Sequence, residues 1–253
     1  MAARELKPEN TGGKNVSRSK RAQAKRGAPT AALRSVPTPG NDDSPYFAGY
    51  QHMAQQLLAQ QNPESEPLKS ILVAGSIRGE GASTVARALA HVLSKNYARR
   101  TILVDANLRT PIQHEAMGVE RAGGVSEIAS DEMSADQAIK NPERPGPALL
   151  TCGRPSPRVA HLLNSAPLRR AIGQLTKEYD WVILDAPPVT THPDAAALVR
   201  LVDGGVLVAR ADWTRREVAQ RALTILQQSG GRVLGVALNR QRYYIPNFIY
   251  RWL

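Results

Sequence analysis

Residues 70–84 read SILVAGSIRGEGAST: a short apolar run, a glycine-rich turn and the beginning of a helical pattern. Gly79 and Gly81 permit a tight turn and a close approach of the backbone to a ligand. In such a turn, successive backbone N–H groups and the N-terminus of the next helix attract an anion. The stretch therefore predicts a buried strand, a phosphate-binding loop and a helix in direct succession.

The loop departs from the common P-loop pattern, GxxxxGK[ST], at one position. Ser83 stands where that pattern places its magnesium-binding hydroxyl, but residue 82 is alanine instead of lysine. A glycine-rich turn by itself also occurs as a plain tight connection. The phosphate-loop interpretation therefore depends on what the rest of the chain brings to the same place.

Two further apolar runs end in an aspartate. Residues 102–111 read ILVDANLRTP and residues 182–188 read VILDAPP, so Asp105 and Asp185 each close a buried strand. Taken singly, either aspartate is typical of a helix N-cap or a turn. Parallel strands would deliver both, with Ser83, to one edge of a sheet, where hard oxygen ligands suit Mg²⁺ beside a phosphate. The combination favours a nucleotide site over two structural caps.

The fold class follows from the alternation of apolar runs with helical patterns. The runs are rich in Val, Ile and Leu, as expected for strands buried on both faces of a parallel sheet. The alternation predicts an α/β fold with a doubly wound, mostly parallel sheet flanked by helices, of the P-loop NTPase type. Strands are predicted at 70–74, 101–105, 148–152, 181–185, 205–209 and 233–238, and helices at 46–60, 83–96, 133–140, 157–177, 192–202 and 214–229.

The net charge is concentrated at the N-terminus. The chain has 253 residues and a formal net charge of +11, and residues 1–40 hold nine basic residues against two acidic ones. Residues 1–44 lack apolar periodicity, so we expect a disordered basic tail before one domain that spans residues 45–253. Such a tail can bind anionic lipid or nucleic acid, but its composition favours a solvated linker, and we expect no nucleic-acid partner.

Several classes of protein are excluded by composition. One cysteine, Cys152, excludes a disulfide framework and a cysteine-rich zinc site. No apolar run approaches the roughly 18 residues that span a bilayer, and the first residues lack the apolar core of a signal peptide. We therefore expect a cytoplasmic, soluble protein. The histidines show no metal-ligand spacing along the chain: His52, His91, His114, His161 and His192.

The last eleven residues, 243–253, hold five of the twelve aromatic residues of the chain. Ile245, Phe248, Ile249 and Trp252 recur at helical spacing and form an apolar stripe. Three interpretations stay open for this segment. The stripe packs on its own domain, it docks on a membrane-protein partner or the bilayer surface, or the tyrosines accept phosphate, namely Tyr243, Tyr244 and Tyr250.

Together, these stretches resemble the cytoplasmic catalytic domain of the bacterial tyrosine kinases of capsule and exopolysaccharide synthesis. That family belongs to the deviant P-loop ATPases related to the septum-site and plasmid-partition ATPases. GSIRGEGAST resembles its first nucleotide motif, ILVDANLRTPIQH its second and YDWVILDAPPV its third, while CGRPSPRVAHLLNS and GVALNR resemble two further segments. The resemblance covers residues 45–253 and implies ATP and Mg²⁺ as cofactors.

The resemblance implies a role for each matching residue of the loop. The backbone of Gly79, Glu80 and Gly81 would hold phosphates. Thr84 would lie near the α-phosphate.

The resemblance also implies a metal site and an adenine site. Ser83, Asp105 and Asp185 would surround Mg²⁺, with Asp105 as the general base and Asp185 acting through a water molecule. Asn239 would contact the edge of the adenine, with Arg240 beside it.

Three departures from the family pattern bear on catalysis and assembly. Ala82 removes the phosphate-binding lysine, and phosphoryl transfer depends mainly on positioning and charge stabilisation. Asn107 replaces the second acid of the D-x-D pair, and residues 46–60 lack the E-x-x-R-x-x-R oligomerisation pattern. We hypothesise that Arg78 reaches a phosphate in place of the missing lysine; a solvent-facing loop arginine is the alternative.

These observations predict a nucleotide-binding regulator of exopolysaccharide or capsule biosynthesis, export or chain length, with weakened or lost kinase activity. An active ATP-dependent protein-tyrosine autokinase is one alternative, and a partition-type ATPase with a DNA-binding tail is another. The resemblance implies a membrane-embedded polysaccharide chain-length or export protein as partner. That partner would recruit the chain to the inner face of the plasma membrane, and assembly into a homo-oligomer stays open.

Overall fold

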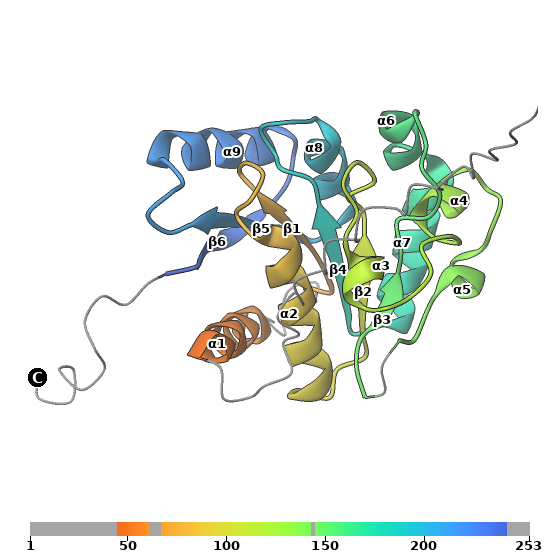
Figure 1. Cartoon of the computed structure of the whole chain (residues 1–253), viewed down its shortest axis with the longest axis horizontal. Coiled ribbons are helices and arrows are strands. Elements are labelled where there is room, and N and C mark those ends of the chain that lie inside the picture. The colour runs from red at the N-terminus through yellow and green to blue at the C-terminus, as the bar shows by residue number, and fades with distance from the viewer. Residues whose placement is uncertain (1–44, 61–66, 143–144, 242–253) are drawn as a thin grey trace, which may run out of the picture. The chain divides into compact units, whose positions relative to one another are not determined.

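The computed structural model describes residues 45–60, 67–142 and 145–241 and places a six-stranded sheet at their centre (Figure 1). All neighbouring strands are parallel, in the order β3-β2-β4-β1-β5-β6. The strand that precedes the glycine-rich loop therefore lies inside the sheet. The strands are β1 (Ser70–Gly75), β2 (Thr101–Asp105), β3 (Ala148–Leu150), β4 (Trp181–Ala186), β5 (Gly204–Arg210) and β6 (Val233–Asn239).

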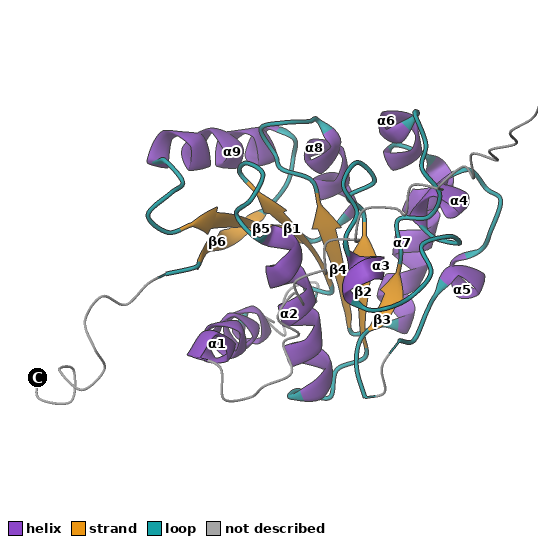
Figure 2. Ribbon diagram, in the orientation of Figure 1, coloured by secondary structure: helices purple, strands orange, loops and turns teal. Residues whose placement is uncertain are grey.

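Helices cover both faces of the sheet (Figure 2). On one face α2 (Ala82–Lys95) packs against the strands and α1 (Pro45–Ala59) packs on α2, with Leu89 and Trp181 fully buried between the layers. Burial on both faces is what the apolar strands require. The opposite face is covered by α6 (Val159–Leu163), α7 (Ala166–Glu178), α8 (Asp194–Leu198) and α9 (Arg216–Gln228).

The predicted α/β fold and parallel sheet are confirmed, and all six strands lie within two residues of their predicted ends. The single helix predicted over 157–177 is wrong, because the chain breaks between α6 and α7. Ser165 caps α7 by accepting a hydrogen bond from the Leu168 N–H, and a proline follows inside the first turn. Two short helices were not predicted, α3 (Gln113–Ala116) and α4 (Val125–Ala129).

The remaining predicted helices are confirmed: α1 and α2 keep their predicted lengths and are each shifted by one residue, and α9 is shorter than predicted. The pattern over 133–140 forms α5 (Ala135–Ala138), and the pattern over 192–202 forms α8 followed by one 3₁₀ turn. The predicted basic tail (1–44) and aromatic segment (243–253), with its three candidate tyrosines, lie outside the described residues. Among the helices that the structure describes, none is long and apolar enough to cross a membrane.

Candidate functional site

The glycine-rich loop joins β1 to α2 and lines a cavity of about 190 Å³. Gly81 has a φ of 88°, in the left-handed region that favours glycine. A Cβ on Gly81 would also come within 2.4 Å of the Asn239 Nδ2 atom, so both backbone and space require glycine here. The cavity is also lined by residues of the second and third motifs: Asn107, Thr110, Ala186 and Pro188.

The side chain of Glu80 points into the loop instead of toward solvent. It is 1% exposed, and its carboxylate accepts hydrogen bonds from the Ile77 N–H at 2.9 Å and from the Thr214 hydroxyl. Gly75 leaves room for it, because a Cβ there would meet Glu80 Oε2 at 2.8 Å. The motif predicts a role for the backbone of Glu80 alone, whereas in the structure its side chain also stabilises the loop through these hydrogen bonds.

Ser83, Asp105 and Asp185 come together as predicted. Asp105 and Asp185 are register partners on β2 and β4, and both are fully buried. The Ser83 hydroxyl, in the first turn of α2, donates a 3.0 Å hydrogen bond to Asp185 Oδ1. One hydroxyl and two carboxyls at the edge of a phosphate loop form a hard-oxygen donor set, so these residues fit Mg²⁺.

Gln113 connects these groups, a role that was not predicted from the sequence. Its side-chain N–H donates to Asp185 Oδ2 at 2.7 Å and to the Ser83 carbonyl at 2.9 Å, while its backbone N–H donates to Asp105 Oδ2 at 3.0 Å. Its side-chain oxygen accepts from Arg87 Nη1 at 3.1 Å. The one signal for Gln113 was its place inside the second acidic motif, RTPIQH.

Arg87 is a buried guanidinium beneath the acid pair, on the inner side of α2. Its Nε and Nη2 atoms have no hydrogen-bond partner among the described residues. Burial lowers the pKa of Arg87, and the charge of Asp185 opposes that change. A positive charge therefore stands inside the protein next to the carboxyls, although residue 82 supplies none.

Burial also changes the pKa values of the two carboxyls, Asp105 and Asp185. Burial and, after it, the nearby Asp185 charge raise the pKa of Asp105 to about 8, although hydrogen bonds that Asp105 accepts from backbone N–H groups oppose the increase. Burial raises the pKa of Asp185 to about 6, opposed by hydrogen bonds from Gln113 and Ser83 and by the charge of Arg87. Without a bound cation both carboxyls therefore hold their protons more strongly than ordinary aspartates do, whereas a bound cation would favour their ionised forms.

The other residues predicted to contact the nucleotide differ in how exposed they are and in whether they already bond within the protein. Arg78 is exposed and lines the cavity, and Thr84 lies half-buried in the first turn of α2. Asn239 uses both ends of its amide within the protein: Nδ2 donates to the Glu80 carbonyl at 2.8 Å and Oδ1 accepts from the Arg240 N–H at 2.9 Å. Its contact with adenine, and that of the exposed Arg240, stay predictions.

The second acidic motif is fixed by two local contacts. Asn107 accepts hydrogen bonds from the N–H and the hydroxyl of Thr110, so it closes a turn. Arg109 forms a two-pronged ion pair with the buried carboxylate of Asp194 in α8, at 2.6 Å and 3.2 Å. This pair joins the motif after β2 to the opposite helical layer and was not predicted.

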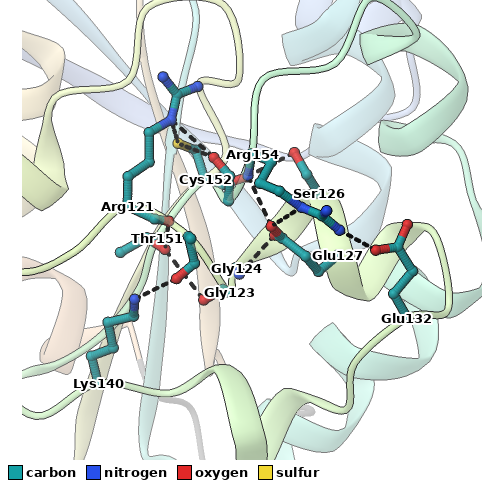
Figure 3. Close-up of polar contacts among 12 residues, drawn as sticks. Arg121, Gly123, Gly124, Ser126, Glu127, Glu132, Lys140, Thr151, Cys152 and Arg154 are labelled. Carbon is teal, nitrogen blue, oxygen red and sulfur yellow. Dashed lines mark hydrogen bonds and ion pairs between the residues drawn. The ribbon is translucent and has the colours of Figure 1, made fainter.

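A polar cluster beside the site joins the segment before α4 to the segment after β3 (Figure 3). Buried Glu127 accepts from the N–H groups of Gly124 and Arg154. Arg121 Nε lies 3.1 Å from the Cys152 sulfur. Burial, and then the charge of Asp105, raises the pKa of the Cys152 thiol to about 11.

Comparison with known proteins identifies similar sequences and structures. Residues 68–228 match the family model described as cellulose biosynthesis protein BcsQ. The tyrosine-protein kinase YwqD of Bacillus subtilis is 31% identical over 175 residues, which cover 69% of this chain and 73% of YwqD. The crystal structure of the chimerical protein CapA2B2 has a TM-score of 0.75 at 25% identity, covering 81% of this chain and 88% of that one.

The cell division ATPase MinD of Pyrococcus furiosus shares the fold alone, with a TM-score of 0.58 at 22% identity over 70% of this chain and 76% of MinD. The phosphate loop, the paired aspartates and these matches lead to one assignment. The chain belongs to the bacterial tyrosine-protein kinases of capsule and exopolysaccharide biosynthesis, which are built on the fold of the MinD and ParA-type P-loop ATPases.

Proposed function

We propose that this chain binds ATP with Mg²⁺ at the β1 loop and regulates exopolysaccharide or capsule biosynthesis, with kinase activity that is weakened or lost. One observation carries the proposal: Ala82 lines the phosphate cavity at the position where the family resemblance places a lysine. A methyl group neither donates a hydrogen bond to a phosphoryl oxygen nor neutralises its charge. Loss of one preorganised donor commonly costs roughly 10²–10³ in rate.

Ser83 and Asp185 would hold the magnesium ion, and Asp105 would accept the proton of an attacking hydroxyl. The ion, when bound, neutralises charge that develops on the phosphates. The 3.0 Å hydrogen bond from Ser83 to Asp185 already assembles two of the oxygen donors. These contacts support nucleotide binding even where the rate of transfer is low.

Asn107, in the second motif, also supports weakened kinase activity. Its side-chain oxygen is occupied by the N–H and hydroxyl of Thr110, so it serves the turn. An amide in that place has no carboxylate with which to accept a proton. Arg78 lines the cavity and is the residue we propose as partial substitute for the lysine; an Arg78→Ala variant with unchanged nucleotide affinity would remove that role.

The partner that we propose is a membrane-embedded polysaccharide chain-length or export protein. This part of the proposal rests on membership of the tyrosine-kinase family. Through that partner the chain would act in the cytoplasm, at the inner face of the plasma membrane, and nucleotide occupancy would be the signal that it transmits.

The test is a nucleotide titration of the purified chain combined with detection of phosphotyrosine after incubation with Mg-ATP. An Asp105→Asn variant provides the background for phosphotyrosine. We expect saturable Mg-ATP binding and phosphotyrosine close to that background. Phosphotyrosine far above the background would establish the alternative, an active autokinase, and the lack of any nucleotide binding would overturn the proposal as a whole.

A further inference from the structure

Three side chains of different chemistry meet beside the acid pair. Asp105 ends β2, His114 lies in α3, and Cys152 follows β3. One potential metal-ligand atom from each lies within 4.8 Å of the other two. The spacing of these residues along the chain did not indicate the group, because three separate segments contribute one ligand each.

The group is buried and two of its atoms lack hydrogen bonds. Asp105 and Cys152 are fully buried, and the side chain of His114 is 14% exposed. Asp105 Oδ1 and His114 Nδ1 have no hydrogen-bond partner in the part of the chain that the structure describes. Leaving a buried polar atom unpaired costs about 1–3 kcal/mol, so two such atoms beside a thiol indicate that a ligand completes the group.

We propose that Asp105, His114 and Cys152 form a binding site for a borderline-soft divalent cation of the Zn²⁺ class. Thiolate, imidazole and carboxylate are the three ligand types that zinc takes, at about 2.3, 2.0 and 2.1 Å. Tetrahedral bonds of those lengths place ligand atoms roughly 3.5 Å apart. The three ligand atoms lie within 4.8 Å of one another, so no pair has to close by more than about 1.3 Å, and water would take the fourth position.

Two of the ligands have polar neighbours. His114 Nε2 lies 3.8 Å from the Glu115 carboxylate, whereas Nδ1 is buried and has no hydrogen-bond partner among the described residues, so we assign Nδ1 to the metal. Arg121 Nε approaches the Cys152 sulfur at 3.1 Å, and Figure 3 shows the rest of its guanidinium pointing away from the sulfur. This cation favours the thiolate; on metal binding the thiol proton leaves to solvent.

The proposed zinc site and the nucleotide site share one residue, Asp105, so the same carboxylate would serve both. Zinc binding itself does not depend on the proposed kinase or ATPase function. Mg²⁺ is a hard ion that prefers oxygen ligands, and it should not compete for the imidazole and thiolate.

The test is a metal titration of the untagged full-length chain. Zn²⁺ binding is measured by calorimetry, and Co²⁺ binding is measured by absorption spectroscopy, which reports thiolate ligation. Cys152→Ser and His114→Gln remove one ligand each, and His161→Gln, an exposed histidine of α6, is the matched control. Because Cys152 is the one cysteine in the sequence, its rate of alkylation gives a second readout in the unmutated chain.

We expect one Zn²⁺ per chain, a thiolate-to-cobalt charge-transfer band, and protection of Cys152 from alkylation by Zn²⁺ but not by Mg²⁺. Each ligand variant should weaken binding at least about tenfold, with His161→Gln unchanged. Equal zinc affinity in Cys152→Ser and the unmutated chain would overturn the proposal. So would an alkylation rate that saturating zinc leaves unchanged, an outcome that needs no variant to fold.

Discussion

Asp105 and Asp185 are register partners at the ends of adjacent parallel strands, with both carboxyls buried. Burial raises the pKa of Asp105 from its ordinary 3.8 to about 8. Between those values the folded chain binds more protons than the unfolded chain, so folding stability falls as pH rises from about 4 to 8. We expect urea unfolding without nucleotide to show this loss, and Asp105→Asn to remove most of it.

The matched control is Asp131→Asn, because the side chain of Asp131 is 76% exposed. That variant should keep the pH dependence of the unmutated chain. Mg-ATP should reduce the loss at pH 8, since a cation between the carboxyls stabilises their charged forms. An Asp105→Asn variant with the same slope against pH as the unmutated chain would contradict the placement of this carboxyl.

Restoring the lysine tests the cause proposed for weak catalysis. Ala82 is half-buried and lines the phosphate cavity, so a longer side chain has space to reach a bound phosphate. Ala82→Lys should raise phosphotyrosine formation by roughly 10²–10³-fold. Ala82→Met has similar length without charge and should not. If Ala82→Lys binds Mg-ATP more tightly yet forms no more phosphotyrosine, the missing lysine is not what limits transfer.

The carboxylate of Glu80 is expected to stabilise the loop before any nucleotide arrives. Glu80→Ala leaves the partly buried Ile77 N–H and Thr214 hydroxyl without their shared acceptor. This should lower the free energy of unfolding by about 2–3 kcal/mol, as measured with urea, and should weaken nucleotide binding. Glu217→Ala, an exposed glutamate in the first turn of α9, should change stability by less than about 0.5 kcal/mol. Equal effects of the two variants would contradict an inward role for Glu80.

The sequence predicted the meeting of Ser83, Asp105 and Asp185 because parallel strands bring their carboxyl ends to one edge. The apolar runs in the sequence identify those strands and therefore the residues at their carboxyl ends. Gln113, Arg87 and the Asp105–His114–Cys152 group were not predictable in the same way. Gln113 lies on a four-residue helix that is too short to show a period, and Arg87 occupies the buried face of a helix where the pattern predicts an apolar residue.

Arg87 gives a prediction whose sign changes with pH. When the acid pair is ionised, the buried guanidinium compensates its charge; when the pair is protonated, the guanidinium is a buried cation with little compensation. Arg87→Met, a side chain of similar length, should therefore lower stability relative to the unmutated chain near pH 8 and raise it near pH 5, as read from urea unfolding at both values. Combining it with Asp185→Asn, which removes the carboxylate whose charge acts on Arg87, should reduce the difference between the two pH values, with a coupling of about 0.5–3 kcal/mol. A constant effect of Arg87→Met across this range would mean that the guanidinium acts on packing alone.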